Sequence, residues 1–211
     1  QSMPRKHTAM GRFKHENCEV VVSKNGQVVA YMGDDERGEH LYKFVSKGKY
    51  IKGAASNYDL LTEGDLFVAI FNENGTGRWV NLKESGMSDS DISIFTRMAA
   101  TQVGATTMDR PEWVAANPNK VEAYCALTNN KNRGVKPNQP VNAVNPRVEN
   151  PYGQIVRWTP DNNEHAADGF KWDLFAMAGN PVVGEGLMKG SENITKDNMF
   201  NSPDGIAFDS K

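Results

Sequence analysis

Three acidic residues each stand directly before a run of β-forming residues. Glu112 begins the run EWVA after a proline, Asp204 follows a proline in the similar segment PDGIA, and Glu16 precedes CEVVV in a looser copy. Calcium and other hard cations bind about six to eight oxygen atoms, mainly from carboxylates, amides and water. If the three segments converge in space, these residues form a metal site. The alternative is that they are polar residues at strand ends with no shared role.

Arg110 lies two residues before Glu112 and adds a different chemistry. Its guanidinium presents planar paired donors that match a phosphate or a carboxylate. An arginine beside clustered acids suits a site that binds an anionic substrate over metal ions. The alternative is a salt bridge from Arg110 to Glu112 or Asp109. The acidic run DDE at residues 34–36 is interpreted as a solvated turn, because most such runs are.

The composition limits the classes of protein to consider. The chain has 211 residues, 38% of them hydrophobic and 24% charged, which fits one large domain or part of a larger protein. The net charge of −2 argues against nucleic acid and anionic membranes as partners, because both attract a basic excess. No apolar run approaches the ~20 residues of a membrane-spanning helix. Cys18 and Cys125 form no CxxC pair and are predicted to be buried thiols, with a disulfide as the alternative.

The two ends of the sequence suggest an excised piece. Residues 1–3 (QSM) are interpreted as the remainder of a cleavable expression tag, so the domain is expected to cover residues 4–211. No signal peptide is evident. The final residues, IAFDSK, stop where a strand is expected to lead into a turn, which suggests an internal fragment.

Strand–turn–strand patterns dominate the chain. Hairpins are predicted at CEVVV–SKNG–QVVAYM, LFVAIF–NENGTG–RWVNL and WVAA–NPNK–VEAYCAL, the first of them around an Asn-Gly turn. Further strands are predicted at QIVRW, FKWDLFAM and GIAF. One helix is predicted over residues 88–104, with Ser88 as its N-cap and Gly104 at its end. Residues 129–153, rich in Asn and Pro, are predicted to form a long loop that is either functional or disordered.

These elements predict an all-β fold in the form of a partial β-propeller. In a propeller the inner strands of the blades begin at one end of a central channel, which would bring the three acids together. At ~40–50 residues per blade, the chain supplies about three to four blades, with one inserted helix near residues 88–104. A full ring needs more blades than this chain provides.

The sequence contains, in this order, the motifs GRFKHE, VVAYMGDDERGEHLYKFVS, MDRPEW, TNN, NPRVENPYGQIVRW and FNSPDGIAFD. Together they closely resemble the PhoX family of alkaline phosphatases, over residues 4–211. The resemblance implies a fragment of a six-bladed propeller that hydrolyses phosphate monoesters at a cluster of calcium and ferric iron on the propeller axis. It also implies export by the twin-arginine route, and so a periplasmic or secreted location and a role in phosphate acquisition.

The resemblance also assigns roles to individual residues. The glutamate of GRFKHE is Glu16, which by resemblance is a ligand of the iron and calcium cluster. Glu112 of RPEW and Asp204 of SPDG correspond to calcium ligands, and Arg110 of RPEW corresponds to the catalytic residue that contacts the substrate phosphate. The pattern of acids before strands points to the same carboxylates.

Some of the family's ligands have no counterpart in this sequence. The family also draws on a cysteine iron ligand and an adjacent Asn-Glu pair upstream of the matching region, and on a glutamate downstream. Neither Cys18 nor Cys125 stands in that cysteine's motif. The fragment is therefore expected to bind calcium alone or no metal and to have little or no phosphatase activity. An incomplete set of blades also predicts self-association through open strand edges.

Two other functions remain as alternatives to the phosphatase. SPDG followed by an aliphatic run also occurs in calcium-dependent lactonase propellers, which would use a single metal and have no need of Arg110. The non-enzymatic alternative is a propeller that holds calcium for stability and serves in binding.

Overall fold

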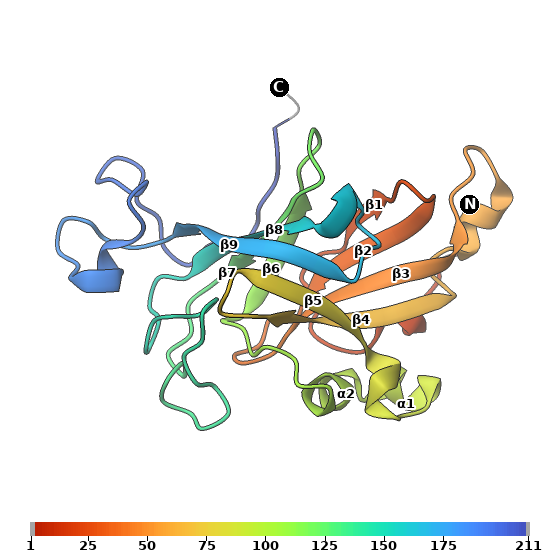
Figure 1. Ribbon diagram of the computed structural model, residues 1–211, viewed down its shortest axis with the longest axis horizontal. Helices are drawn as coiled ribbons and strands as arrows, with labels where there is room; N and C mark the ends of the chain where they lie inside the picture. The colour runs from red at the N-terminus through yellow and green to blue at the C-terminus, as the bar shows by residue number, and fades with distance from the viewer. Residues whose placement is uncertain (1–2, 210–211) are drawn as a thin grey trace.

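The computed structural model describes residues 3–209 (Figure 1). Gln1 and Ser2 of the predicted tag lie outside the described residues, and Met3 is exposed. The strands are β1 (Glu19–Val22), β2 (Gln27–Gly33), β3 (Leu41–Lys49), β4 (Gly64–Phe71), β5 (Thr76–Asn81), β6 (Pro111–Ala116), β7 (Ala123–Leu127), β8 (Gln154–Pro160) and β9 (Gly169–Met177). The α-helices are α1 (Asp89–Ile94) and α2 (Thr96–Gln102), and short 3-10 helices lie at Thr8–Met10, Ala55–Asp59, Leu82–Ser85, Asp161–Asn163 and Gly186–Lys189. A helix with the length and apolar character to cross a membrane is not found among the described residues.

The strands form one antiparallel sheet in the order β1-β2-β3-β4-β5-β9-β8-β7-β6. Strands β1 to β5 make one meander and β6 to β9 make a second, and pairing between β5 and β9 joins them. The predicted all-β class with the arrangement of a partial propeller is confirmed. The number of blades, expected as three to four, stays a prediction, because all nine strands belong to one hydrogen-bonded sheet. The helices, the long loop and the C-terminal segment take up the remaining residues.

The three predicted hairpins are confirmed as β1–β2, β4–β5 and β6–β7, and QIVRW and FKWDLFAM fall in β8 and β9. The strand predicted at GIAF is wrong, because residues 203–209 are irregular. This segment meets β6 through a backbone bond from the Trp113 amide to the Asp204 carbonyl at 3.4 Å, and side chains occupy one edge of β6. Asn17 bonds both the amide and the carbonyl of Val114 through its side chain, and Glu19 Oε1 accepts from the amide of Ala116.

The helix predicted over residues 88–104 is divided into α1 and α2 by Phe95, whose φ is −109° and ψ is 41°. Ser88 is the N-cap as predicted, and its Oγ accepts from the amide of Asp91 at 3.1 Å. At the break, Thr96 Oγ1 accepts from the amide of Arg12 at 2.9 Å. This bond ties the start of α2 to the N-terminal segment, which a helical pattern alone does not reveal.

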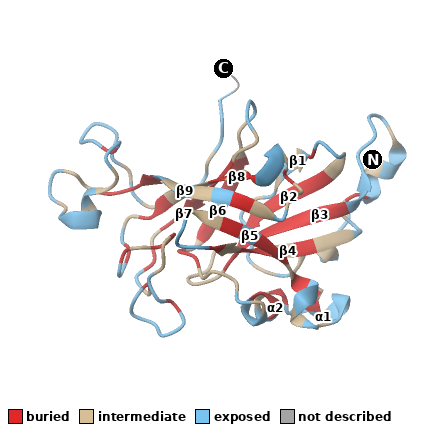
Figure 2. Cartoon of the chain, viewed as in Figure 1, coloured by how far each residue is buried: buried red, intermediate tan, exposed pale blue. Residues whose placement is uncertain are grey.

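Buried residues run along the strands of the sheet (Figure 2), and they form two hydrophobic clusters. One hydrophobic cluster contains Tyr31, Trp79 and Trp158, whose ring centroids lie 5.2 to 6.1 Å apart. A second cluster joins residues of β2 to β5, such as Phe44, to residues of the helices, such as Ala99. The first cluster, with these three aromatic rings, fills the space between the two meanders. Its close packing sets the position of β2 relative to β6.

Strands β2 and β6 approach each other closely at Gly33, the last residue of β2. A Cβ atom at Gly33 would overlap the carbonyl oxygens of Pro111 and Glu112. Glycine therefore lets the end of β2 lie directly against the beginning of β6. This contact sets the distance between Glu112 and the segment that follows β2.

Gly33→Ala is expected to destabilise the fold by about 1–3 kcal/mol, the range for forcing an extra carbon into a packed site. Urea unfolding followed by tryptophan fluorescence measures this change. Gly205→Ala is the control, because a Cβ there meets no atom closer than 3.8 Å. It is expected to shift the free energy of unfolding by less than about 0.5 kcal/mol. Equal stability of the two variants would contradict the close approach.

Candidate metal centre

Three carboxylates meet near the beginning of β6. Oxygen atoms of Glu16, Glu112 and Asp204 all lie within 4.8 Å of one another. Glu16 comes from the segment before β1, Glu112 is the second residue of β6, and Asp204 comes from the C-terminal segment. Glu112 is buried, whereas Glu16 and Asp204 are exposed. The acids singled out in the sequence therefore do converge, although no strand follows Asp204.

The donor set suits a hard cation. Calcium binds about six to eight oxygen atoms, so three carboxylates supply part of a coordination shell and water or further residues supply the rest. Burial, followed by the charges of Asp35, Asp204 and Glu16, raises the pKa of Glu112 to about 8. A buried carboxylate with several negative neighbours is unfavourable as an anion, and a cation bound beside it would relieve this penalty.

Arg110 pairs with Glu112, one of its two expected partners, and also with a carboxylate that was not expected, that of Asp35. Its Nε and Nη2 donate to the two oxygens of Asp35 at 2.9 and 3.1 Å, and its Nη2 lies 3.6 Å from Glu112 Oε1. Its φ of +48° is in the left-handed region, which residues other than glycine rarely adopt. Asp109, the other expected partner, bonds Arg133 Nε at 2.6 Å instead.

The interpretation of residues 34–36 as a solvated turn is wrong for the first two residues. Asp34 is fully buried and accepts from Arg97 Nε and Nη2 at 2.8 and 2.7 Å. Asp35 is held by Arg110 in the same bidentate way. These partners are 63 and 75 residues away, so nothing near the acidic run distinguishes it from a solvated one.

Asp109 has a structural role that its sequence context does not reveal, because its carboxylate is fully buried. Its Oδ1 accepts from Asn130 and Arg133 at 2.8 and 2.6 Å, and its Oδ2 accepts from Asn150 and Gln154 at 3.0 and 3.3 Å. We call these four donors the Asp109 cage. The excess of Asn in the long loop was the available signal, because amide side chains can satisfy a buried carboxylate.

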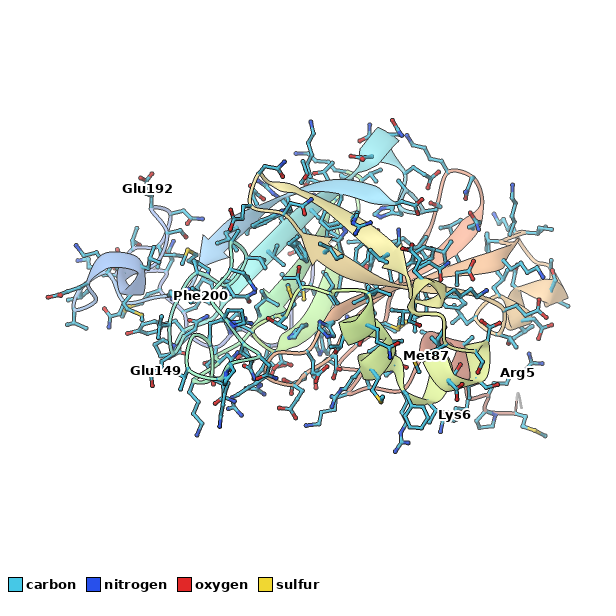
Figure 3. All side chains as sticks on the ribbon, turned by 60° about the horizontal axis from the view of Figure 1, so that its bottom comes forward. Arg5, Lys6, Met87, Glu149, Glu192 and Phe200 are labelled. Carbon is cyan, nitrogen blue, oxygen red and sulfur yellow. The ribbon has the colours of Figure 1, made fainter. Side chains whose placement is uncertain are left out.

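The long loop at residues 129–153 is thus ordered around the Asp109 cage, and Figure 3 shows its exposed Glu149 at the periphery of the molecule. The same loop holds the segment that carries Asp204. The carbonyl of Tyr152 accepts from the amide of Ser202 at 2.6 Å, and Asn129 Nδ2 donates to Ser202 Oγ at 3.0 Å. One loop therefore positions both Asp204 and the residues that precede Glu112.

The predicted burial of the cysteines is confirmed for Cys125 and wrong for Cys18, which is exposed. Cys18 lies one residue before β1 begins, so it is outside the paired strand. Both thiols are free. In the described part of the chain, the group of possible ligands around Glu112 consists of carboxylates alone.

A family model described as alkaline phosphatase PhoX matches residues 1–211. The chain belongs to the PhoX alkaline phosphatase family. A solved structure of Pseudomonas fluorescens PhoX in complex with vanadate, a transition state analogue, matches 100% of this chain with 48% sequence identity and a TM-score of 0.94. The chain spans 39% of the length of that PhoX chain. Comparison with curated protein sequences gives no match.

The raised pKa of Glu112 makes the stability of this PhoX-family chain depend on pH. The folded chain keeps a proton on Glu112 up to about pH 8, whereas the unfolded chain releases it near the ordinary value of 4.5. Without metal, stability is therefore lost as the pH rises from about 4.5 to about 8. Glu112→Gln is expected to remove this loss and to be more stable than wild type at pH 9 by on the order of 5 kcal/mol.

Chemical denaturation between pH 5 and pH 9 in the presence of a chelator measures the effect. Glu149→Gln, which removes an exposed carboxylate from the long loop, is the control and should follow the wild-type profile. Added calcium is expected to stabilise the wild type at pH 9 more than Glu112→Gln. Parallel pH profiles for the wild type and Glu112→Gln would show that Glu112 does not titrate in this way.

Proposed function

We propose that this chain is part of a phosphate-monoester hydrolase in which Glu16, Glu112 and Asp204 bind calcium and Arg110 binds the substrate phosphate. One observation carries the proposal: three carboxylates lie within 4.8 Å of one another, and Arg110 Nη2 lies 3.6 Å from one of them. Phosphoryl transfer needs bound cations and a fixed donor for the phosphate oxygens side by side. Membership of the PhoX family supports the same chemistry.

The residues of this chain are proposed to have two roles: the carboxylates bind the metal ions, and Arg110 binds and orients the phosphate. Calcium and ferric iron, when bound, would neutralise the phosphate oxygens and position an oxygen nucleophile. Glu112 is buried at the beginning of β6 and is held in place by the sheet, whereas Glu16 and Asp204 remain open to solvent. Arg110 donates hydrogen bonds to the phosphate and stabilises the charge that builds up in the transition state.

The chain by itself is proposed to have little or no activity. It spans 39% of the vanadate-bound PhoX chain, and by resemblance the family's cysteine, Asn-Glu pair and further glutamate lie outside it. Three carboxylates leave about half of a calcium coordination shell to water. We therefore propose that this part binds calcium at most, and that iron requires the additional ligands.

A lactonase activity is less well supported. A lactone is neutral, so a calcium-dependent lactonase gains little from a guanidinium beside its metal ligands. Arg110 is nevertheless held there with a φ of +48°. Such strained conformations persist only where the surrounding structure imposes them, and they are concentrated at functional sites. The placement of Arg110 therefore favours an anionic substrate.

The test is hydrolysis of p-nitrophenyl phosphate by the complete protein with and without a calcium chelator. We expect turnover that the chelator abolishes. Arg110→Ala is expected to lower kcat/KM about 10²- to 10³-fold, the usual effect of removing a group that stabilises transition-state charge. The isolated chain of 211 residues is expected to be inactive.

Arg78→Ala is the control for the loss of a positive charge, because Arg78 is exposed on β5, and it should retain wild-type kinetics. Lack of turnover by the complete, metal-loaded protein would contradict the proposal. Wild-type kinetics of Arg110→Ala would remove Arg110 from the mechanism. Hydrolysis of a lactone in place of the phosphate ester would favour the lactonase.

We further propose a periplasmic or secreted location, supported by family membership, and self-association of the isolated chain through β1. β1 ends the sheet, and within residues 3–209 no strand pairs with its outer edge. Val20 and Val22 on this strand are 48% and 51% exposed. An unpaired edge with exposed apolar side chains favours pairing with a second copy.

Val20→Lys is expected to weaken dimerisation of the isolated chain about tenfold, because a charged side chain on an edge strand opposes pairing. Analytical ultracentrifugation over a concentration series measures the dissociation constant. Val135→Lys is the control, since Val135 is 56% exposed on the long loop, away from β1. A wild-type chain that stays monomeric at all concentrations would sink the proposal.

A further inference from the structure

Asp35 makes a contact with Arg110 that the proposed function does not use. It lies two residues after β2, and its carboxylate accepts from Nε and Nη2 of Arg110 at 2.9 and 3.1 Å. The two side chains are 20% and 24% exposed. A bidentate pair of this kind fixes the plane of a guanidinium, which a single hydrogen bond does not.

The fold fixes the backbone around Asp35 on several sides. Its amide donates to the carbonyl of Lys14 at 3.0 Å. Just before it, Asp34 is fully buried against Arg97, and Gly33 lies against the carbonyl oxygens at the beginning of β6. The position of the Asp35 carboxylate is therefore set by β2 and its contacts rather than by the arginine that it binds.

Asp35 is not placed as a metal ligand. Its oxygens are outside the group formed by Glu16, Glu112 and Asp204, and both of them accept hydrogen bonds from Arg110. Any effect of Asp35 on a bound phosphate is therefore exerted through the guanidinium.

The pair leaves one donor edge of the guanidinium available, the fork formed by the terminal nitrogens Nη1 and Nη2. Asp35 takes one N–H on Nε and one on Nη2, so both N–H groups on Nη1 and the second on Nη2 remain. Nη2 lies 3.6 Å from Glu112 Oε1, which places this fork beside the three carboxylates. Two terminal nitrogens in this arrangement can bind a phosphate in a bidentate manner. We propose that Asp35 is a positioning residue that turns this fork of Arg110 toward the phosphate.

The same contact limits how closely Arg110 approaches Glu112, with which it forms a long ion pair. Glu112 is already 3.6 Å from Nη2, so a guanidinium released by Asp35 has a carboxylate within reach. A closer salt bridge to Glu112 would occupy N–H groups of Arg110 that are proposed to bind phosphate. It would also occupy a Glu112 oxygen that is proposed to bind the cation. Asp35 therefore holds the arginine at this longer distance from Glu112 while it orients the guanidinium.

This inference rests on the proposed phosphatase function, and a double-mutant cycle in the complete, metal-loaded protein tests it. Asp35→Asn is expected to raise the inhibition constant of inorganic phosphate and to lower kcat/KM, each about tenfold, because the guanidinium loses its orientation. In an Arg110→Ala background, Asp35→Asn is expected to change both quantities less than about twofold, because its effect passes through Arg110.

Asp173→Asn is the matched control. Asp173 on β9 is held by Nε and Nη2 of Arg157 in the same side-on geometry, and this variant should keep wild-type kinetics. Metal content and melting temperature are measured for every variant, and Asp35→Asn should leave the metal content unchanged. If Asp35→Asn does not fold, Asp35→Glu keeps the charge, displaces the carboxylate and takes its place in the cycle.

Two kinetic results would overturn the inference: wild-type phosphate inhibition in the Asp35 variant, or equal losses with and without Arg110. The first would mean that Asp35 does not orient Arg110, and the second that Asp35 acts through the fold alone. Calorimetry with inorganic phosphate separates the two proposals. Phosphate binding that depends on both residues, without turnover, would support Asp35 while the phosphatase proposal fails. Absence of phosphate binding would reject both.

Discussion

The buried charge of Asp109 is the constraint on which the site depends. Arg133, Asn130, Asn150 and Gln154 replace the water that this carboxylate gives up, through hydrogen bonds of 2.6 to 3.3 Å. Removing one partner from a buried ion pair costs about 3–5 kcal/mol, a large share of the stability of a typical domain. The long loop that supplies most of these donors therefore has one favourable arrangement, wrapped around the residue before Arg110.

The Asp109 cage explains how a strained residue can be kept beside the metal ligands. Asp109 points into the cage, Arg110 has a φ of +48°, and Pro111 and Glu112 then begin β6. A conformation of this kind costs about 1–3 kcal/mol and persists only when both flanks are fixed. The cage fixes the preceding residue, and pairing of β6 with β7 fixes the following ones. The hydrogen bonds of the Asp109 cage thus stabilise the strained backbone that places the Arg110 side chain beside Glu112.

Patterns between neighbouring residues were enough to predict the hairpins and the three candidate ligands. Turn residues and alternating apolar residues are adjacent in the sequence, and each ligand stands directly before or within such a pattern. The pairs of Asp34 with Arg97 and Asp35 with Arg110 join residues 63 and 75 positions apart, and a solvated turn has the same local sequence. The strand expected at GIAF failed for a related reason. Only the folded chain shows that this segment meets β6 through the bond from the Trp113 amide to the Asp204 carbonyl, and that side chains from before and within β1 also bond β6.

The charges in the site also impose an order of binding under the proposed function. The carboxylates of Glu16, Glu112 and Asp204 lie together, and the guanidinium of Arg110, paired with Asp35, lies beside one of them, Glu112. A phosphate monoester is an anion, so this set repels it whenever the carboxylates are ionised. One arginine that is already paired with Asp35 cannot offset the remaining negative charges. We therefore expect the substrate to bind after Glu16, Glu112 and Asp204 hold their cations, because in the metal-free site these acids repel phosphate.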